Sequence, residues 1–250
     1  MTGSLAVIGL GPGAASLLTP EAAVALDGAT DLVGYAPYLD RVPHRPGLRR
    51  HPTDNRQEGD RARHALNLAA SGAGVAVVSG GDAGVFGMAS AVFEAVEAGP
   101  SPWRALDIRV VPGVSAVIAV AARLGAPLGG DFCVLSLSDN LKPWRLIERR
   151  LRAAASSGFA LALYNPASQA RPGQLGQAFA LLREELPGTV PVVFAAAVTR
   201  PDERIQFATL ADADPARADM RTLVFVGTEA TRLIERPGAD PWLYAPRRAA

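Results

Sequence analysis

Short runs of consecutive apolar residues alternate with helix-like segments along most of this 250-residue chain. A strand that is apolar at every position, rather than at every second one, has both faces buried, so helices must cover both sides of its sheet. The strand candidates are residues 5–8, 31–34, 74–79, 108–111, 132–137, 160–164, 190–195, 204–209 and 222–226. The pattern therefore predicts an α/β fold with parallel or mixed sheets.

Helix signals separate these strand candidates. Thr19-Pro20-Glu21 combines an N-cap residue, a first-turn proline and an early acid, which is typical of a helix start. Further helices are expected over residues 57–70, 115–124, 143–156 and 172–186.

The glycine-rich stretch 125–130 divides the chain into two halves of similar size and is the best candidate for a linker. We therefore expect an N-terminal α/β domain over 1–125 and a C-terminal one over 126–250. In the second half, the strand candidates 190–195 and 204–209 are separated only by a turn containing Arg200-Pro201-Asp202, which favours a hairpin. The first domain should hold a parallel sheet and the second a mixed one.

Composition excludes several classes of protein. Cys133 is the single cysteine, which excludes an intramolecular disulfide and a cysteine-rich metal site and indicates a reducing compartment. No apolar run reaches about 18 residues, and the N-terminus lacks the basic residues of an export signal. We expect a cytoplasmic protein that binds neither a membrane nor, with a net charge of +1, a nucleic acid.

One segment departs from this neutral balance. Residues 41–63 contain seven arginines and three acids, which gives +4, and His44, His51 and His64 lie in or beside the segment. Such a run is commonly a solvated surface loop, but it could also bind a polyanion.

Three loops dense in glycine and proline follow three of the strand candidates. They are 9–14 (GLGPGA), 80–87 (GGDAGVFG) and 112–116 (PGVSA). In an open α/β sheet, ligands bind outside the carboxyl ends of the strands, so these loops should line one crevice.

The first loop also fits the loose dinucleotide pattern G-x-G-x-x-A, which would indicate an NAD-linked oxidoreductase. Two details argue against that alternative. The next helix signal comes only at Thr19-Pro20, whereas a dinucleotide loop runs directly into its helix. Pro12 also lacks the N–H that would face a phosphate.

These three loops, in this order and spacing, resemble those of the tetrapyrrole methylases, which use S-adenosylmethionine. Three further segments resemble the branch that methylates carbon 17 of precorrin-3B and contracts its ring to precorrin-4 in cobalamin biosynthesis. They are 34–40 (GYAPYLD), 136–144 (SLSDNLKPW) and 164–171 (YNPASQAR). The resemblance implies two α/β domains, a homodimer, and S-adenosylmethionine bound in the cleft between the domains.

The resemblance also implies which residues contact the cofactor. They are Pro12, Gly80, Gly81, Asp82, Val85, Ser115, Ala116 and Asn165, together with Ala197 and Val198. At the last two positions this chain departs from the family, which usually has Asn-Ala-Gly or Asn-Gly there, and only a backbone contact could survive the change.

A precorrin carries acetate and propionate arms and is therefore a polyanion. Tyr35, Arg49, Arg50 and Asp139 are the candidate substrate contacts, and arginines of the basic segment could pair with the carboxylates. The sequence predicts no metal site and does not identify a catalytic residue.

The candidates for an acid or base in ring contraction are Asp139, Tyr35, Tyr38, His44 and His51. Cys133 lies in an apolar run and is expected to pack in the core. Three alternatives remain open at this point: a cobalt-loaded or other precorrin as substrate, an NAD-linked oxidoreductase, and a tetrapyrrole carrier without turnover.

Overall fold

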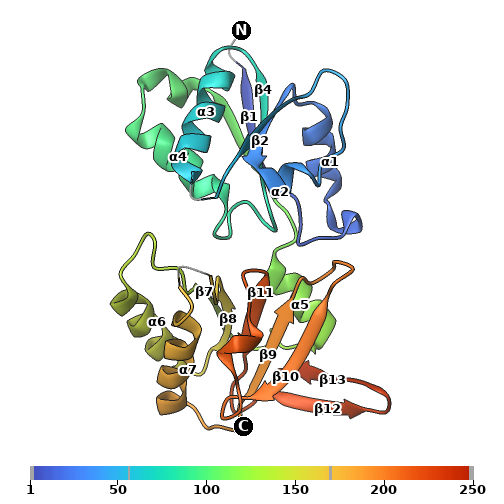
Figure 1. Ribbon diagram of the computed structural model, residues 1–250, viewed down its shortest axis with the longest axis vertical. Coiled ribbons are helices and arrows are strands. Elements are labelled where there is room, and N and C mark those ends of the chain that lie inside the picture. Colours follow the sequence, from blue (N-terminus) through green and yellow to red (C-terminus); the bar gives the residue numbers. More distant parts are fainter. Residues whose placement is uncertain (1–2, 56, 169–170, 248–250) are drawn as a thin grey trace. The chain divides into compact units, whose positions relative to one another are not determined.

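The computed structural model describes residues 3–55, 57–168 and 171–247. Arg56 of the basic segment and residues 169–170 of the YNPASQAR segment lie outside this part of the chain. The chain forms two compact units, Met1–Ala116 and Val117–Ala250, called unit one and unit two below (Figure 1). The linker candidate 125–130 lies within unit two, where its first two residues form β6 (Gly125–Ala126) and pair with β13 (Ala239–Tyr244).

Unit one contains a five-stranded sheet in the order β3-β2-β4-β1-β5, and every neighbouring pair is parallel. The strands are β1 (Ser4–Gly9), β2 (Asp31–Tyr35), β3 (Arg49–Thr53), β4 (Gly74–Ser79) and β5 (Asp107–Val111). The parallel N-terminal sheet predicted from the apolar runs is confirmed. Because the strands are parallel, the loops that follow them leave from one edge of the sheet.

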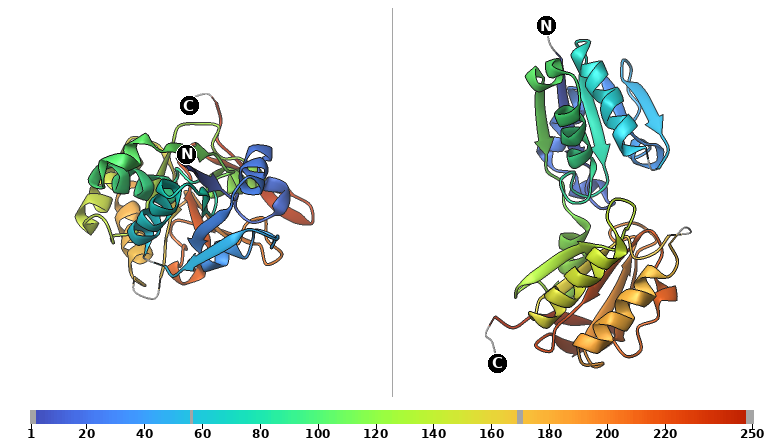
Figure 2. Two further views of the ribbon diagram at one scale, coloured as in Figure 1. Left: turned by 90° about the horizontal axis from the view of Figure 1, so that it is seen from above. Right: turned by 90° about the vertical axis from the view of Figure 1, so that its left-hand side faces the viewer.

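Helices cover both faces of this sheet, as the continuous apolar runs require (Figures 1 and 2). The helices are α1 (Pro20–Asp27), α2 (Ala36–Leu39), α3 (Glu58–Ala70) and α4 (Met88–Ala98). Leu5 and Val7 of β1 face the core formed with α3 and α4, whereas Ala6 and Ile8 face the core formed with α1 and α2. The predicted helix start is confirmed, because the Ala22 N–H donates to Thr19 Oγ1 and Pro20 is the first helical residue.

Unit two contains a mixed five-stranded sheet in the order β10-β9-β11-β8-β7. The strands are β7 (Phe132–Ser136), β8 (Ala160–Tyr164), β9 (Pro191–Ala196), β10 (Arg204–Thr209) and β11 (Thr222–Val226). Only the β7–β8 pair is parallel; the predicted β9–β10 hairpin is antiparallel, as expected. The predicted mixed sheet is therefore confirmed.

The helices of unit two are α5 (Ala116–Leu124), α6 (Trp144–Ser156) and α7 (Gln174–Glu185). Figure 1 shows α6 and α7 side by side, and their apolar sides share one core with alternate residues of the sheet. Phe179 of α7 and Phe194 of β9 meet edge to face in this core, with ring centroids 6.0 Å apart. A second, small sheet has the order β12-β13-β6, with β12 spanning Arg232–Arg236.

Several elements were not predicted. β3 has the sequence RRHPT, and its polar, partly exposed residues give no apolar run. α4 begins after Gly87, which offers no side chain to cap the helix, so it lacks the signal that marked α1. In the described part of the chain, no helix is long and apolar enough to cross a membrane.

Candidate functional site

The three glycine-rich loops meet at the carboxyl edge of the unit-one sheet. The Gly11 N–H donates to the Gly81 carbonyl at 3.0 Å, and the Gly81 N–H donates back to the Gly11 carbonyl at 2.8 Å. Both glycines have positive φ, +70° and +68°, a conformation that residues with a side chain rarely adopt. The glycines of the first two loops therefore permit a direct backbone link between them.

The third loop approaches the other two as closely. A Cβ atom on Gly113 would lie 2.4 Å from the Gly81 oxygen and 2.7 Å from the Gly9 oxygen. No side chain fits at that distance, so the backbones of all three loops are in contact only because this position is glycine. The expectation that the three loops lie together is confirmed.

Asp82 joins the second and third loops through its side chain. Its Oδ1 accepts from the Gly84 N–H at 2.8 Å, and its Oδ2 accepts from the Gly113 N–H at 2.9 Å. Ser115 is buried, and the Ala116 nitrogen lies 3.8 Å from the place of a Cβ on Gly81. The predicted cofactor contacts of unit one are thus brought together, with Pro12 and Val85 half-buried in the first and second loops.

Two residues that support these loops come from the segment after β2. The ring of Tyr38 lies against Gly80, where an added Cβ would be 2.8 Å from its Cζ, and Tyr35 meets Tyr38 edge to face. Arg41 Nη2 donates to the carbonyls of Leu10 at 2.6 Å and Gly11 at 3.0 Å. Sequence reasoning placed Arg41 only in a basic segment, because nothing in the sequence indicates that its partner is the first glycine loop.

The first loop does not have the geometry of a dinucleotide site. After Gly11 the chain forms a short 3-10 turn, Ala15–Leu17, and α1 begins only at Pro20. The amides at the start of α1 are thus separated from the glycines by this turn, whereas a pyrophosphate site needs the two to be continuous. The structure supports the argument made from the sequence against NAD.

Arg49 and Arg50, predicted to bind substrate, have partners within unit one. Arg49 donates from Nε and Nη2 to the two oxygens of Asp31, at 2.8 and 2.6 Å, while its side chain is 66% exposed. Arg50 donates to the carbonyls of Val42 and Leu39. A role for either arginine at the substrate stays a prediction, since five N–H groups allow further contacts.

Asp31 is a fully buried carboxylate at the start of β2. Besides Arg49, it is in contact with His51 Nε2, 2.9 Å from Oδ1, and accepts from Thr30 Oγ1 at 2.8 Å. The Arg49 guanidinium holds the pKa of Asp31 well below its usual range, and the His51 and Thr30 contacts act in the same direction against burial.

The histidine candidates differ in their surroundings. His51 Nδ1 lies 3.0 Å from His64 Nε2, so His51 connects buried Asp31 to an exposed imidazole. His44 is exposed. In the described part of unit one, neither His44 nor His51 contacts the glycine loops. The catalytic role of each therefore stays a prediction.

Arg61 of α3 is a buried arginine of the basic segment. It donates from Nε to Thr53 Oγ1 at 2.6 Å and from Nη2 to the Asp54 carbonyl at 2.8 Å. Burial lowers the pKa of Arg61. Arg61 therefore joins α3 to the chain after β3 within the segment, whereas Arg41 and Arg49 link the segment to other parts of unit one, and the charge count alone reveals neither.

The predicted contacts in unit two lie at the ends of strands. Asn165 follows β8 with φ +52°, and its Nδ2 donates to Ser136 Oγ at 2.9 Å. Ala197 follows β9 with φ +51°, and both it and Val198 are buried. Left-handed backbone is costly for alanine and easier for asparagine or glycine, so the departure from the family falls on a strained residue. The cofactor role of these three residues stays a prediction.

Asp139 lies in the loop after β7, with its Oδ1 3.9 Å from Nε of Arg171. Cys133 is half-buried in β7 and packs against the unit-two core, as expected.

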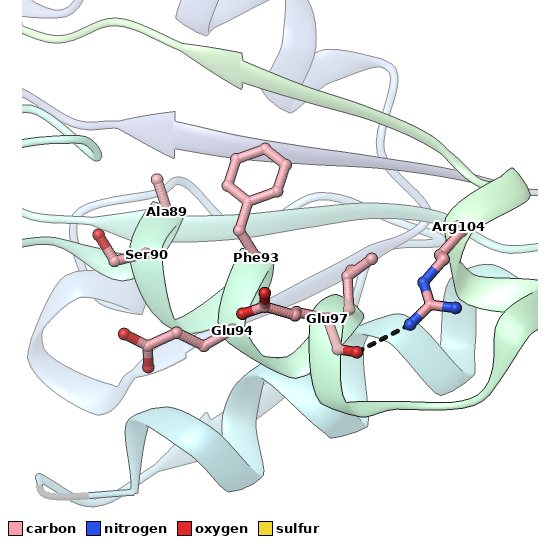
Figure 3. A pocket seen from close by; sticks show the side chains of 7 residues that line it. Ala89, Ser90, Phe93, Glu94, Glu97 and Arg104 are labelled. Atoms are coloured by element: carbon pink, nitrogen blue, oxygen red, sulfur yellow. Dashed lines mark hydrogen bonds between the residues drawn. The ribbon is translucent and has the colours of Figure 1, made fainter.

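A hollow is lined by residues of α4 and by Arg104, which follows that helix (Figure 3). Its lining is Ala89, Ser90, Phe93, Glu94, Val96, Glu97 and Arg104. It shares no residue with the predicted site, and Arg104 is held there by donating to the Glu97 carbonyl at 2.9 Å. Across the described residues there is also no group of three or more His, Cys, Asp or Glu side chains that could hold a metal ion.

The family model of the Tetrapyrrole (Corrin/Porphyrin) Methylases matches residues 4–214. The chain belongs to this family and is a methyltransferase of cobalamin biosynthesis.

Three proteins illustrate its similarity in sequence to other members of the family. The chain is 56% identical over 247 residues to precorrin-3B C(17)-methyltransferase of Sinorhizobium sp, covering 99% of this chain and 97% of that protein. It is 48% identical to the cobalamin biosynthesis protein CobIJ of Mycobacterium tuberculosis (H37Rv), covering 99% of this chain and 49% of that protein. It is 41% identical to the probable cobalt-factor III C(17)-methyltransferase of Salmonella typhimurium, covering 91% of this chain and 93% of that protein.

Solved structures agree with this placement. The crystal structure of the methyltransferase CobJ matches with a TM-score of 0.93 and 54% identity, covering 98% of this chain and 100% of that one. Uroporphyrin-III C-methyltransferase of Thermus thermophilus, solved as a complex with S-adenosyl homocysteine, has a TM-score of 0.67 and 22% identity, and covers 90% of this chain and 97% of that one. That second likeness concerns the fold alone.

Proposed function

We propose that this protein transfers a methyl group from S-adenosylmethionine to carbon 17 of precorrin-3B and contracts the ring to precorrin-4. The observation that carries the proposal is the 56% identity, over nearly the full length of both chains, to a protein named for that reaction. The cluster of three glycine loops in unit one supplies the cofactor contacts that the reaction needs.

The form of the loop cluster suits S-adenosylmethionine better than a dinucleotide. This cofactor has no phosphate, so it does not need loop and helix amides to be continuous. It needs backbone N–H and carbonyl groups for its adenine and amino-acid ends, and glycine-rich loops expose these. We assign Pro12, Gly80, Gly81, Asp82, Val85, Ser115 and Ala116 to cofactor binding on this basis.

S-adenosylmethionine supplies an electrophilic methyl group. The residues of the chain have to hold the two reactants in line, and alignment alone can lower a barrier by about 7–11 kcal/mol. The Gly11–Gly81 link and the Asp82 cross-link fix the loops that would do this. A small apolar group such as Val85 beside the sulfonium would not oppose dispersal of its positive charge during transfer.

Among the candidates for a proton-transferring group in ring contraction, Tyr38 contacts the proposed cofactor loops. Its hydroxyl would lie 3.0 Å from a Cβ on Gly80. Tyr35 packs on Tyr38, and His51 is in contact with Asp31. We therefore propose Tyr38 as the first of these candidates to test. Tyr38→Phe should slow ring contraction and leave the affinity for S-adenosylmethionine unchanged.

The cobalt-loaded precursor is the second candidate substrate, because the chain is also 41% identical to a probable cobalt-factor III C(17)-methyltransferase. The two substrates are separated by one assay, in which S-adenosylmethionine is mixed with precorrin-3B or with its cobalt counterpart. Mass and absorbance are followed in time. We expect precorrin-3B to gain one methylene unit and change its chromophore faster than the cobalt compound. A product from the cobalt compound alone would overturn the choice of substrate.

NAD should not compete with S-adenosylmethionine in an equilibrium binding assay, whereas S-adenosylhomocysteine should. Displacement by NAD would instead support the oxidoreductase alternative. The homodimer and the cytoplasmic location stay predictions.

A further inference from the structure

Arg171, in the loop after β8, has an unusual environment. Its side chain is only 12% exposed, and both Nε and Nη1 are fully buried without a hydrogen-bond acceptor among the described residues. Guanidinium groups are almost never buried without partners, because loss of hydration is costly unless an acceptor replaces the water. A buried, unsatisfied cation in a native fold therefore needs an explanation.

The fold holds this side chain in a defined place. β7 and β8 are parallel neighbours whose last residues, Ser136 and Tyr164, pair, and the Leu137 N–H donates to the Tyr164 carbonyl at 2.9 Å. The loops after both strands therefore start side by side. Arg171 is fixed further by its own N–H, which donates to the Ser168 carbonyl at 2.9 Å.

The groups around Arg171 do not neutralise it. The nearest carboxylate oxygen in an ion pair with it, Oδ1 of Asp139, lies 3.9 Å from Nε, which is beyond a hydrogen bond. Lys142 comes from the same loop as Asp139. Burial lowers the pKa of Lys142, and the positive charges of Arg150 and Arg171 lower it further, while Asp139 opposes them. Arg171 and Lys142, with Arg150 near Lys142, outnumber the one carboxylate and leave the cluster with a net positive charge.

Two more buried donors lie in or directly beside these loops. Trp144 Nε1 belongs to the first residue of α6, directly after the loop that holds Lys142, and Ser168 Oγ belongs to the residue whose backbone pairs with Arg171. Neither has a hydrogen-bond partner among the described residues. Unsatisfied donors and net positive charge both indicate a missing acceptor that carries negative charge.

We propose that Arg171 and Lys142 form a carboxylate-binding site, and that it takes one carboxylate arm of the tetrapyrrole substrate. This assignment rests on the proposed function. A planar guanidinium matches a carboxylate by geometry as well as by charge. Asp139 balances one of the two positive charges of Arg171 and Lys142. The site can therefore bind one further negative charge.

The carboxylate of S-adenosylmethionine is the other source of the same chemistry, and steady-state kinetics separates the two. Arg171→Met removes the charge and keeps the length of the side chain. It should raise the KM for precorrin-3B by about ten- to a hundredfold, the loss of one charge-assisted pairing. The dissociation constant of S-adenosylmethionine, measured by titration calorimetry, should not change.

Arg149→Met is the matched control, because Arg149 is an exposed arginine of α6. It should leave the KM unchanged. An unchanged KM in Arg171→Met, or a weaker binding of S-adenosylmethionine with an unchanged KM, would overturn the proposal.

A second measurement does not depend on turnover. Thermal unfolding is compared in sodium acetate and in sodium chloride at equal ionic strength, for the wild type and for Arg171→Met. Acetate should raise the Tm of the wild type above its value in chloride, and the variant should show no difference. If no precorrin is methylated but this acetate effect holds, the proposed function fails and the carboxylate site stands. Equal acetate effects in both proteins would overturn the site.

Discussion

Asp31 in unit one and Arg171 in unit two are both buried charges, but their surroundings are opposite. Asp31 is fully buried and has contacts to Arg49, His51 and Thr30, all within 2.9 Å. Arg171 has two buried nitrogens without an acceptor among the described residues, and its ion-pair partner Asp139 is 3.9 Å away.

This difference separates two uses of a buried charge. A charge whose hydrogen-bonding capacity is met inside the fold contributes to holding that fold together, and removing it leaves its partners unpaired. A charge whose capacity is not met lowers stability, because its lost hydration is not replaced, and it is available to a ligand. The two charges should therefore respond in opposite ways to removal.

The largest effect is expected for Asp31→Asn. The amide cannot accept all the hydrogen bonds from Arg49, His51 and Thr30, and the charge-assisted ones are the strongest, so the variant should lose about 2–4 kcal/mol of unfolding free energy at pH 7. Urea unfolding monitored by circular dichroism measures this. A loss below about 0.5 kcal/mol would contradict a structural role for the cluster.

The same cluster predicts a pH dependence. Because the pKa of Asp31 is lowered in the fold, its contribution is complete above the ordinary value of 3.8 and is lost as the pH falls below it toward the folded-state value. The difference in stability between wild type and Asp31→Asn should thus be constant from pH 5 to 7 and shrink in more acidic solution. A difference that instead shrinks as the pH rises from 5 to 7 would exclude this carboxylate as the cause.

Gly113→Ala should have the next largest effect, because its Cβ would lie 2.4 Å from the Gly81 oxygen. Forcing the glycine loops apart should cost about 1–3 kcal/mol of stability and weaken S-adenosylmethionine binding by about tenfold or more. Gly59→Ala is the control, since the new methyl group there would meet only the Arg63 side chain, at 3.6 Å. Calorimetric titration of the three proteins gives the comparison.

Asp82→Asn should be milder. The amide keeps one acceptor oxygen but turns an NH2 group toward one of the two N–H donors, Gly84 or Gly113, so one hydrogen bond is lost for about 1–2 kcal/mol. The affinity for S-adenosylmethionine should fall with it, because the second and third loops lose their cross-link. Full affinity in the variant would show that the cross-link does not position the cofactor.

Arg171→Met should have the smallest effect on stability. Replacing a cation that has two buried nitrogens without an acceptor by an apolar side chain of similar length should change the unfolding free energy by less than about 0.5 kcal/mol, or raise it. Urea unfolding without ligand measures this. A loss above about 2 kcal/mol would show that Arg171, like Asp31, stabilises the fold. The proposed difference between the two buried charges would then be wrong.

Much of the fold could be predicted because several of its strands are apolar throughout. The consecutive apolar residues of β1, β4, β8 and β11 were enough to predict these strands. The short turn at Arg200-Pro201-Asp202 predicted the β9–β10 hairpin. β3 could not be found in this way, since RRHPT is held as an edge strand by pairing with β2 rather than by its own burial.

The sequence predicted the parts of the site that are formed by close backbone contacts of glycines. It did not predict the contacts that are made by long side chains. The close approach of Gly9, Gly81 and Gly113 is visible in the sequence as three glycine-rich loops after strands. The partners of arginines are not, because a flexible side chain can reach many acceptors. Arg41 binds the first glycine loop and Arg49 binds Asp31, and neither contact follows from the net charge of the segment.

The most direct test of the central claim is transfer of a labelled methyl group. The protein is incubated with S-adenosylmethionine carrying a ¹³C-methyl group and with precorrin-3B, and the product is analysed by NMR and mass spectrometry. We predict a single labelled methyl on carbon 17 of a ring-contracted product. A labelled methyl at another carbon, or an unlabelled pigment recovered with intact cofactor, would contradict the account.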